Sequence, residues 1–165
     1  MNKELKIKVC GMRDAENIHQ LVTLPIDYIG FIFYAKSARF VSGKPEVSIP
    51  SSIKKVGVFV NSSKEEITAK IKEFDLQVVQ LHGDESPEFC QEINDLGVET
   101  FKAFGIDNEF DWATIATYEG KVDYFLFDTK SKQYGGTGQT FNWEKLKGYP
   151  YNTPYWLSGG ISLDN

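Results

Sequence analysis

Two polar residues close apolar, strand-like runs, and either of them could move a proton. Cys10 ends the run 5–10 and precedes Gly11, and Asp128 ends the run 124–128. In barrels of alternating strands and helices, side chains at the C-terminal ends of the strands face the active site. A thiolate can serve as a base, and a carboxyl group at the rim of an apolar strand can serve as an acid. The two residues therefore predict acid–base chemistry.

Each of these residues also has a purely structural interpretation. A free cysteine is often just a small buried apolar residue, and aspartate is common in turns and helix caps. Cys10 precedes a glycine turn, and Asp128 precedes a long loop rather than a helix, so both positions favour a functional role. A catalytic thiolate also requires positive charge or helix N-termini close by.

Glycine-rich loops follow the last two apolar runs. The loop 135–138 reads Gly-Gly-Thr-Gly, and it is either a flexible hairpin or a lid whose N–H groups face an anion. Gly136 is the candidate substrate-binding residue in this loop. Gly159 and Gly160 follow the last run, at a position where many barrels hold a phosphate with backbone N–H groups. The pattern favours a phosphorylated small-molecule substrate. The first loop lacks a following Lys and Ser or Thr, so it is not a P-loop.

Two more polar side chains follow strand-like runs. Arg39 is either a solvated surface residue or a clamp on a carboxylate, which the planar guanidinium group fits well. His82 ends another run, and a structural hydrogen bond rivals a role in the site. His19 belongs to an expected helix and should be exposed. Two scattered histidines and two cysteines do not make a zinc site, so we expect no metal.

Seven short apolar runs alternate with helical patterns along the chain. The runs cover residues 5–10, 29–33, 56–60, 78–81, 101–104, 125–127 and 155–157. Runs that are apolar on both faces suit parallel strands covered by helices. Alternation of strands and helices favours a parallel α/β fold. Seven such units, with polar or glycine-rich loops after most strands, favour a (β/α)8 TIM barrel over an open sheet.

Local signals place helices between these runs. Ser63 opens a capping box, in which side chains satisfy free N–H groups of the first helical turn. Ser86 precedes a proline at the first helical position, and Asp14 can cap the first helix. The stretch 44–52 contains two prolines and the stretch 142–147 is short, so both carry weak helical signals.

Composition limits the class of protein. The 165 residues are 41% hydrophobic and 25% charged, which suits one globular domain over residues 1–165. No run approaches the ~20 apolar residues of a membrane span, and no signal peptide opens the chain. We therefore expect a cytoplasmic protein with free thiols and no membrane partner. The net charge of −5 argues against nucleic-acid binding, and composition leaves the oligomeric state open.

Motifs along the whole chain together resemble the phosphoribosylanthranilate isomerase family of tryptophan biosynthesis. In order, they are Lys8-Val9-Cys10-Gly11, Gly30-Phe31-Ile32-Phe33, Ser37-Ala38-Arg39-Phe40-Val41, Gly57-Val58-Phe59-Val60-Asn61, Gln80-Leu81-His82-Gly83-Asp84-Glu85, Phe127-Asp128 with Gly135-Gly136-Thr137-Gly138, and Leu157-Ser158-Gly159-Gly160-Ile161. The resemblance implies a single-domain (β/α)8 barrel that needs no cofactor. It also implies the Amadori rearrangement of N-(5-phosphoribosyl)anthranilate.

The resemblance implies a role for each candidate residue. Cys10 would be the general base and Asp128 the general acid. Arg39 would meet the carboxylate of the anthranilate group, and His82 would line the pocket. Gly159-Gly160 would carry part of the phosphate site.

The sequence departs from the family pattern in two ways. Ala38 stands where the family usually has a proline, which affects loop stiffness. The family's eighth βα unit is missing after the seventh run, whereas such barrels need ~200 residues or more. We therefore expect a C-terminally incomplete barrel, with weak or no isomerase activity if the chain ends there. The alternatives are an inactive truncated barrel or another sugar-phosphate barrel, such as indole-glycerol-phosphate synthase, which would use a lysine or paired aspartates.

Overall fold

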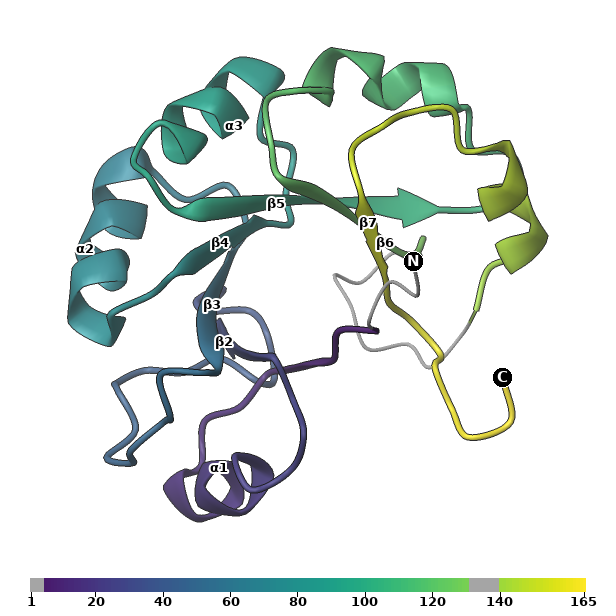
Figure 1. Cartoon of the computed structure of the whole chain (residues 1–165). Coiled ribbons are helices and arrows are strands. Elements are labelled where there is room, and N and C mark those ends of the chain that lie inside the picture. The colour runs from purple at the N-terminus through teal and green to yellow at the C-terminus, as the bar shows by residue number, and fades with distance from the viewer. Residues whose placement is uncertain (1–4, 131–139) are drawn as a thin grey trace. The chain divides into compact units, whose positions relative to one another are not determined.

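The computed structural model describes residues 5–130 and 140–165. Strands alternate with helices in chain order within these residues, apart from one connection between two strands that holds no helix (Figure 1). The elements are β1 (Lys8–Cys10), α1 (Ala15–Leu21), β2 (Tyr28–Ile32), β3 (Lys54–Phe59), α2 (Lys64–Phe74), β4 (Val78–Leu81), α3 (Pro87–Asn94), β5 (Glu99–Ile106), the 3-10 helix η1 (Trp112–Tyr118), β6 (Tyr124–Thr129), the 3-10 helix η2 (Trp143–Gly148) and β7 (Tyr155–Leu157). All seven strand-like runs of the sequence are therefore strands. Gly136 and its glycine-rich loop lie outside the described residues.

The chain forms two compact units, Met1–Gln80 and Leu81–Asn165, and the boundary between them falls within β4. In the first unit, β1 pairs with β2 and β2 pairs with β3. In the second unit, β5 pairs with β6 and β6 pairs with β7. All of these pairs are parallel, and the strand order within each unit follows the chain. The sequential parallel order confirms the predicted parallel α/β fold.

The core of the first unit lies around β2, where all five residues are buried. A strand that is buried along its whole length needs apolar side chains on both faces, which the sequence of β2 supplies. Helix α2 packs against β3. Its inner face buries Ile67 and Phe74, and the Phe74 ring lies 5.5 Å from that of Phe31 and 4.8 Å from that of Phe33.

The core of the second unit is built on β5 and β6. Phe101, Phe125 and Phe127 are fully buried there, and helix α3 packs against β5 and η1. Figure 1 shows α3 beside the long strand β5. One charged residue, Lys102, is buried among these aromatic side chains, with only 2% of its surface exposed.

The predicted helix starts are confirmed. The side chains of Asp14, Ser63 and Ser86 each accept a hydrogen bond from a backbone N–H of the first helical turn. The weak stretch 44–52 holds no helix between β2 and β3. Prolines remove backbone N–H donors, which explains this outcome. The short stretch near residue 142 forms only the 3-10 helix η2. In the described part of the chain, no helix has the length and apolar character to cross a membrane.

Candidate active site

Cys10 is the last residue of β1, and the parallel register places it opposite Gly30 of β2. A side chain at Gly30 would collide with the thiol, because a Cβ atom there would lie 2.6 Å from Cys10 Sγ. The Cys10 sulfur therefore occupies the space that the glycine leaves open. The backbone N–H groups of Gly11 and Met12 both donate to the Gly30 carbonyl, at 2.9 and 3.0 Å. These bonds fix the turn that follows Cys10.

Arg39 lies next to Cys10 in the same unit. Its Nη1 donates to the Cys10 carbonyl oxygen at 3.1 Å. Its side chain lies across Gly11, where a Cβ atom would come within 2.8 Å of Arg39 Cδ and Nη1. Gly11 also has a φ of +85°, a conformation that favours glycine. Arg39 is exposed, so its guanidinium group puts positive charge beside β1 where a small anion can reach it.

Asp128 lies near the end of β6 in the second unit. Its Oδ1 accepts a hydrogen bond from the backbone N–H of Thr129 at 2.8 Å. Its Oδ2 lies 4.0 Å from His82 Nε2, and the two side chains are only 13% and 20% exposed. The carboxylate is therefore partly buried and faces an imidazole ring that directly follows β4.

Gly159 follows β7 and lies against the Asp128 carboxylate. A Cβ atom at Gly159 would lie closer to Asp128 Oδ1 than van der Waals contact allows, and it would lie 3.0 Å from the Thr129 nitrogen. Gly159 and Gly160 have φ angles of +87° and +66°. The Ser158 N–H donates to the Phe127 carbonyl at 2.8 Å, which carries the β6–β7 pairing up to this turn.

The structure thus brings the predicted residues together in two groups. Cys10 and Arg39 are neighbours in the first unit, while Asp128, His82 and the Gly159-Gly160 turn are neighbours in the second. Every member lies near or after the C-terminal end of a strand. His19 is exposed on α1, as expected from the sequence.

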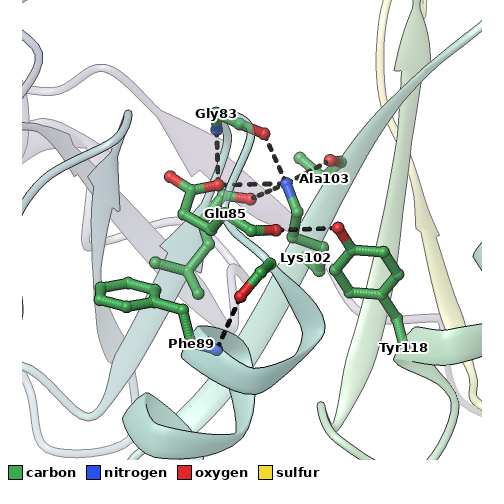
Figure 2. A network of polar contacts seen from close by, with 8 residues as sticks. Gly83, Glu85, Phe89, Lys102, Ala103 and Tyr118 are labelled. Carbon is green, nitrogen blue, oxygen red and sulfur yellow. Dashed lines mark hydrogen bonds and ion pairs between the residues drawn. The ribbon is translucent and has the colours of Figure 1, made fainter.

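The sequence reasoning missed a buried ion pair next to His82. Lys102 Nζ of β5 lies 3.1 Å from Glu85 Oε2, and the two side chains are 2% and 3% exposed (Figure 2). The available signal was a lysine in the middle of the apolar run 101–104. A buried charge needs a partner, so such a lysine predicts an acidic neighbour.

The second cysteine does not share the setting of Cys10. Cys90 lies on α3 and is fully buried, and this burial raises the pKa of its thiol to about 12. A thiol with such a pKa stays protonated at neutral pH and is a poor nucleophile. Among the described residues, no group of three or more His, Cys, Asp or Glu side chains is arranged to hold a metal ion.

Parallel strands in chain order, with polar side chains gathered at their C-terminal ends, define the class of (β/α)8-barrel enzymes. A family model described as N-(5′-phosphoribosyl)anthranilate (PRA) isomerase matches residues 7–165. The chain belongs to this family. The resemblance noted in the sequence and the predicted fold class are both confirmed, and the match does not favour indole-glycerol-phosphate synthase.

Individual relatives agree with the family match. An N-(5′-phosphoribosyl)anthranilate isomerase from Phocaeicola vulgatus is 48% identical over 155 residues, which cover 94% of this chain and 75% of the relative. The crystal structure of the phosphoribosyl anthranilate isomerase from Thermotoga maritima matches with a TM-score of 0.85 and 35% identity, covering 98% of this chain and 80% of that one.

A third relative was solved with a ligand. It is a phosphoribosyl anthranilate isomerase in complex with reduced 1-(o-carboxyphenylamino)-1-deoxyribulose 5-phosphate. It matches with a TM-score of 0.64 and 27% identity, covering 97% of this chain and 90% of that one.

Proposed function

We propose that this chain acts in tryptophan biosynthesis, in the cytoplasm, as an isomerase that needs no cofactor. It converts N-(5-phosphoribosyl)anthranilate to 1-(2-carboxyphenylamino)-1-deoxyribulose 5-phosphate, with residues 1–165 acting as a barrel-type domain. The observation that carries the proposal is the family match over residues 7–165. The phosphorylated ligand bound by one solved relative supports the class of substrate.

Asp128 is the general acid of the first step. Its carboxyl group gives a proton to the ring oxygen of the closed sugar, and the bond between that oxygen and the anomeric carbon breaks. The lone pair of the anthranilate nitrogen forms the new C=N bond, so the product is an open-chain iminium ion. The place of Asp128 near the C-terminal end of β6 supports this role, because barrel enzymes carry their catalytic side chains at that end of the strands.

Cys10 is the general base of the second step. Its thiolate removes the proton from C2′ of the iminium ion. The electron pair of that C–H bond forms the C1′=C2′ double bond, and the π pair of the C=N bond returns to nitrogen. The resulting enolamine then becomes the ketone. The place of Cys10 at the C-terminal end of β1 supports this role, and Arg39 binds the Cys10 carbonyl at the same strand end. The nitrogen atom of the substrate therefore supplies an electron pair in the first step and takes one back in the second.

Four further elements bind the substrate. Arg39 clamps the anthranilate carboxylate with its planar guanidinium group, and His82 lines the pocket beside Asp128. The Gly159-Gly160 turn holds the phosphate group with backbone N–H groups, and Gly136 contributes from the loop before η2. The positive φ angles of Gly159 and Gly160 support this role, because successive N–H groups in such a turn form a concave anion site.

The test is turnover of the natural substrate, followed by the loss of anthranilate fluorescence. Cys10→Ser and Asp128→Asn should each lower kcat on the order of 100-fold or more, because each removes one proton transfer. Asp75→Asn is the matched control for the aspartate, since Asp75 is exposed at the end of α2 and should keep normal turnover.

Thermal unfolding of the same variants separates chemistry from folding. The two catalytic variants should melt close to the unmodified chain. Near-normal turnover in Cys10→Ser or in Asp128→Asn would remove the role assigned to that residue. Turnover of an indole-glycerol-phosphate synthase substrate in place of the proposed one would overturn the function itself.

A further inference from the structure

We propose that Lys102 and Glu85 are positioning residues that hold His82 against Asp128. The inference rests on the proposed function, in which His82 and Asp128 meet the substrate. It concerns the second compact unit alone, and all of its contacts lie between residues 81 and 128. Neither residue touches the reacting atoms in the proposed chemistry.

The Lys102 ammonium group binds the backbone on both sides of His82. Its Nζ donates to the Gly83 carbonyl at 2.7 Å and lies 3.5 Å from the Leu81 carbonyl (Figure 2). It also donates to the Ala103 carbonyl of its own strand at 3.2 Å. One cation on β5 therefore contacts the carbonyl groups of both residues that flank His82.

Glu85 binds the same short loop from the other side. Its Oε2 accepts a hydrogen bond from the Lys102 ammonium group at 3.1 Å and another from the backbone N–H of Gly83 at 2.9 Å. Its own carbonyl accepts the hydroxyl of Tyr118 at 2.9 Å, which ties the loop to η1. Gly83 is thus held at its N–H by Glu85 and at its carbonyl by Lys102 (Figure 2).

These contacts leave the backbone of residues 81–85 little freedom. The His82 side chain leaves this loop toward β6, where its Nε2 reaches 4.0 Å from Asp128 Oδ2. The loop lies between a buried strand and helix α3, whose first turn is fixed by the cap of Ser86. A histidine on a loop without these bonds would sample several orientations, and the distance to Asp128 would vary.

The choice of lysine at position 102 follows from hydrogen-bond geometry. An ammonium group has three protons, and the Gly83 carbonyl, the Glu85 carboxylate and the Ala103 carbonyl supply three acceptors within 3.2 Å. An apolar side chain would fill the same space but would leave these buried acceptors without a donor. A residue that served packing alone would not need this charge.

The first test reads the His82 ring directly by NMR. The chain has two histidines, so the imidazole Hε1 region should show one signal for His82 and one for the exposed His19 on α1. Lys102→Met should move or broaden the His82 signal and leave the His19 signal unchanged. The matched control is Lys55→Met, which removes another strand lysine with an acidic partner, in the first unit. That control should leave both signals in place.

A second variant separates positioning from the burial of an unpaired charge. Lys102→Met alone leaves the Glu85 carboxylate buried without its ion-pair partner, and the loss of melting temperature would then be large. Lys102→Met with Glu85→Gln removes both charges and should recover most of that loss. The bond to the Gly83 carbonyl remains absent in this double variant, so the His82 signal should stay displaced. A His82 signal that returned to its original position together with the melting temperature would overturn the proposal.

The third test is kinetic. Lys102→Met combined with Glu85→Gln should lower kcat/KM on the order of 10- to 100-fold, because small misplacements of a site residue have effects of this size. In a chain that already carries His82→Ala, the same two changes should lower kcat/KM no further. A full additional loss in that background would show that Lys102 acts through something other than His82. If the unmodified chain lacks turnover, the proposed function fails, while the NMR signal of His82 still decides this inference.

Discussion

Gly159 lies against the carboxylate of the proposed general acid, so we expect the lack of a side chain at this position to matter for function. A Cβ atom at this position would overlap Asp128 Oδ1. We expect Gly159→Ala to turn or displace the Asp128 carboxylate and to lower kcat at least tenfold, since misplacement of a catalytic group is costly. The measurement is steady-state turnover together with the free energy of unfolding.

Gly97→Ala is the matched control for this change. Gly97 also has a positive φ, +81°, but no atom lies near the place where its Cβ would be. Both variants should lose about 1–2 kcal/mol of stability from the left-handed backbone conformation, and only Gly159→Ala should lose turnover. Equal kinetics in the two variants would show that the contact with Asp128 is unimportant.

Arg39 combines exposure with a fixed place beside Cys10, as expected for a group that captures an anion. We expect Arg39→Ala mainly to raise KM, because a contact to the carboxylate is present in the substrate and the transition state alike. Arg39→Lys should recover little of this loss, because an ammonium group lacks the planar fork. The assay is substrate saturation kinetics of both variants. An unchanged KM in both would make Arg39 a surface residue.

Helix α2 begins with a reciprocal cap, and the cap is the clearest local stabilising device of the first unit. Ser63 Oγ accepts the N–H of Glu66 at 3.2 Å, and the Glu66 carboxylate accepts the N–H of Ser63 at 3.0 Å. We expect Ser63→Ala to lower the free energy of unfolding by about 1 kcal/mol. Urea denaturation measures this loss.

The neighbouring Ser62→Ala serves as the control, because Ser62 precedes the cap and does not close the first turn. This variant should stay within about 0.5 kcal/mol of the unmodified chain, the usual range for a surface substitution. The capping variant should also keep its kinetics, since α2 carries none of the proposed site residues. Equal stability of the two serine variants would contradict the role of the cap.

The stability of the whole molecule should fall toward both ends of the pH scale. Hydrogen bonds from Lys55 and Lys130 hold the pKa values of Asp75 and Asp107 below the usual 3.8. A lowered pKa contributes stability above pH 3.8 that is lost as the pH falls. Both carboxylates are on the surface, so stability should fall only slightly at acid pH. Salt should make this fall smaller still.

The loss of stability at alkaline pH should be steeper, because Cys90 is buried and Tyr118 and Tyr149 are partly buried. Burial raises the pKa of the Cys90 thiol from 9.0 to about 12, and it also raises the pKa values of Tyr118 and Tyr149 above 10.0. A raised pKa contributes stability that is complete below the unfolded value and is lost as the pH rises. We therefore expect the melting temperature to fall progressively from pH 9 upward.

Cys90→Ala tests how much the Cys90 thiol contributes to the fall in melting temperature at alkaline pH. The variant should melt lower at every pH because it leaves a small cavity. Its melting temperature should fall less between pH 9 and 12 than that of the unmodified chain, because the variant lacks the thiol that ionises on unfolding. Parallel curves for the variant and the unmodified chain would show that Cys90 does not ionise on unfolding in this range.

Local sequence signals predict much of the architecture. The seven apolar runs, the caps at Asp14, Ser63 and Ser86 and the two weak helical stretches all appear in the structure as predicted. These signals are local, because a cap or a strand-length apolar run depends on residues within a few positions of one another. The same local order placed Cys10 and Asp128 at strand ends.

The contacts that shape the site depend on tertiary structure. Arg39 lies over Gly11, Gly159 lies against Asp128, and Lys102 binds the residues that flank His82. Each contact joins segments in or after different strands. Such contacts are set by the register of parallel strands and by the space that a glycine leaves open, and neither is written in a local pattern. The sequence could therefore name the polar residues at the strand ends, and only the folded chain decides which atoms they touch.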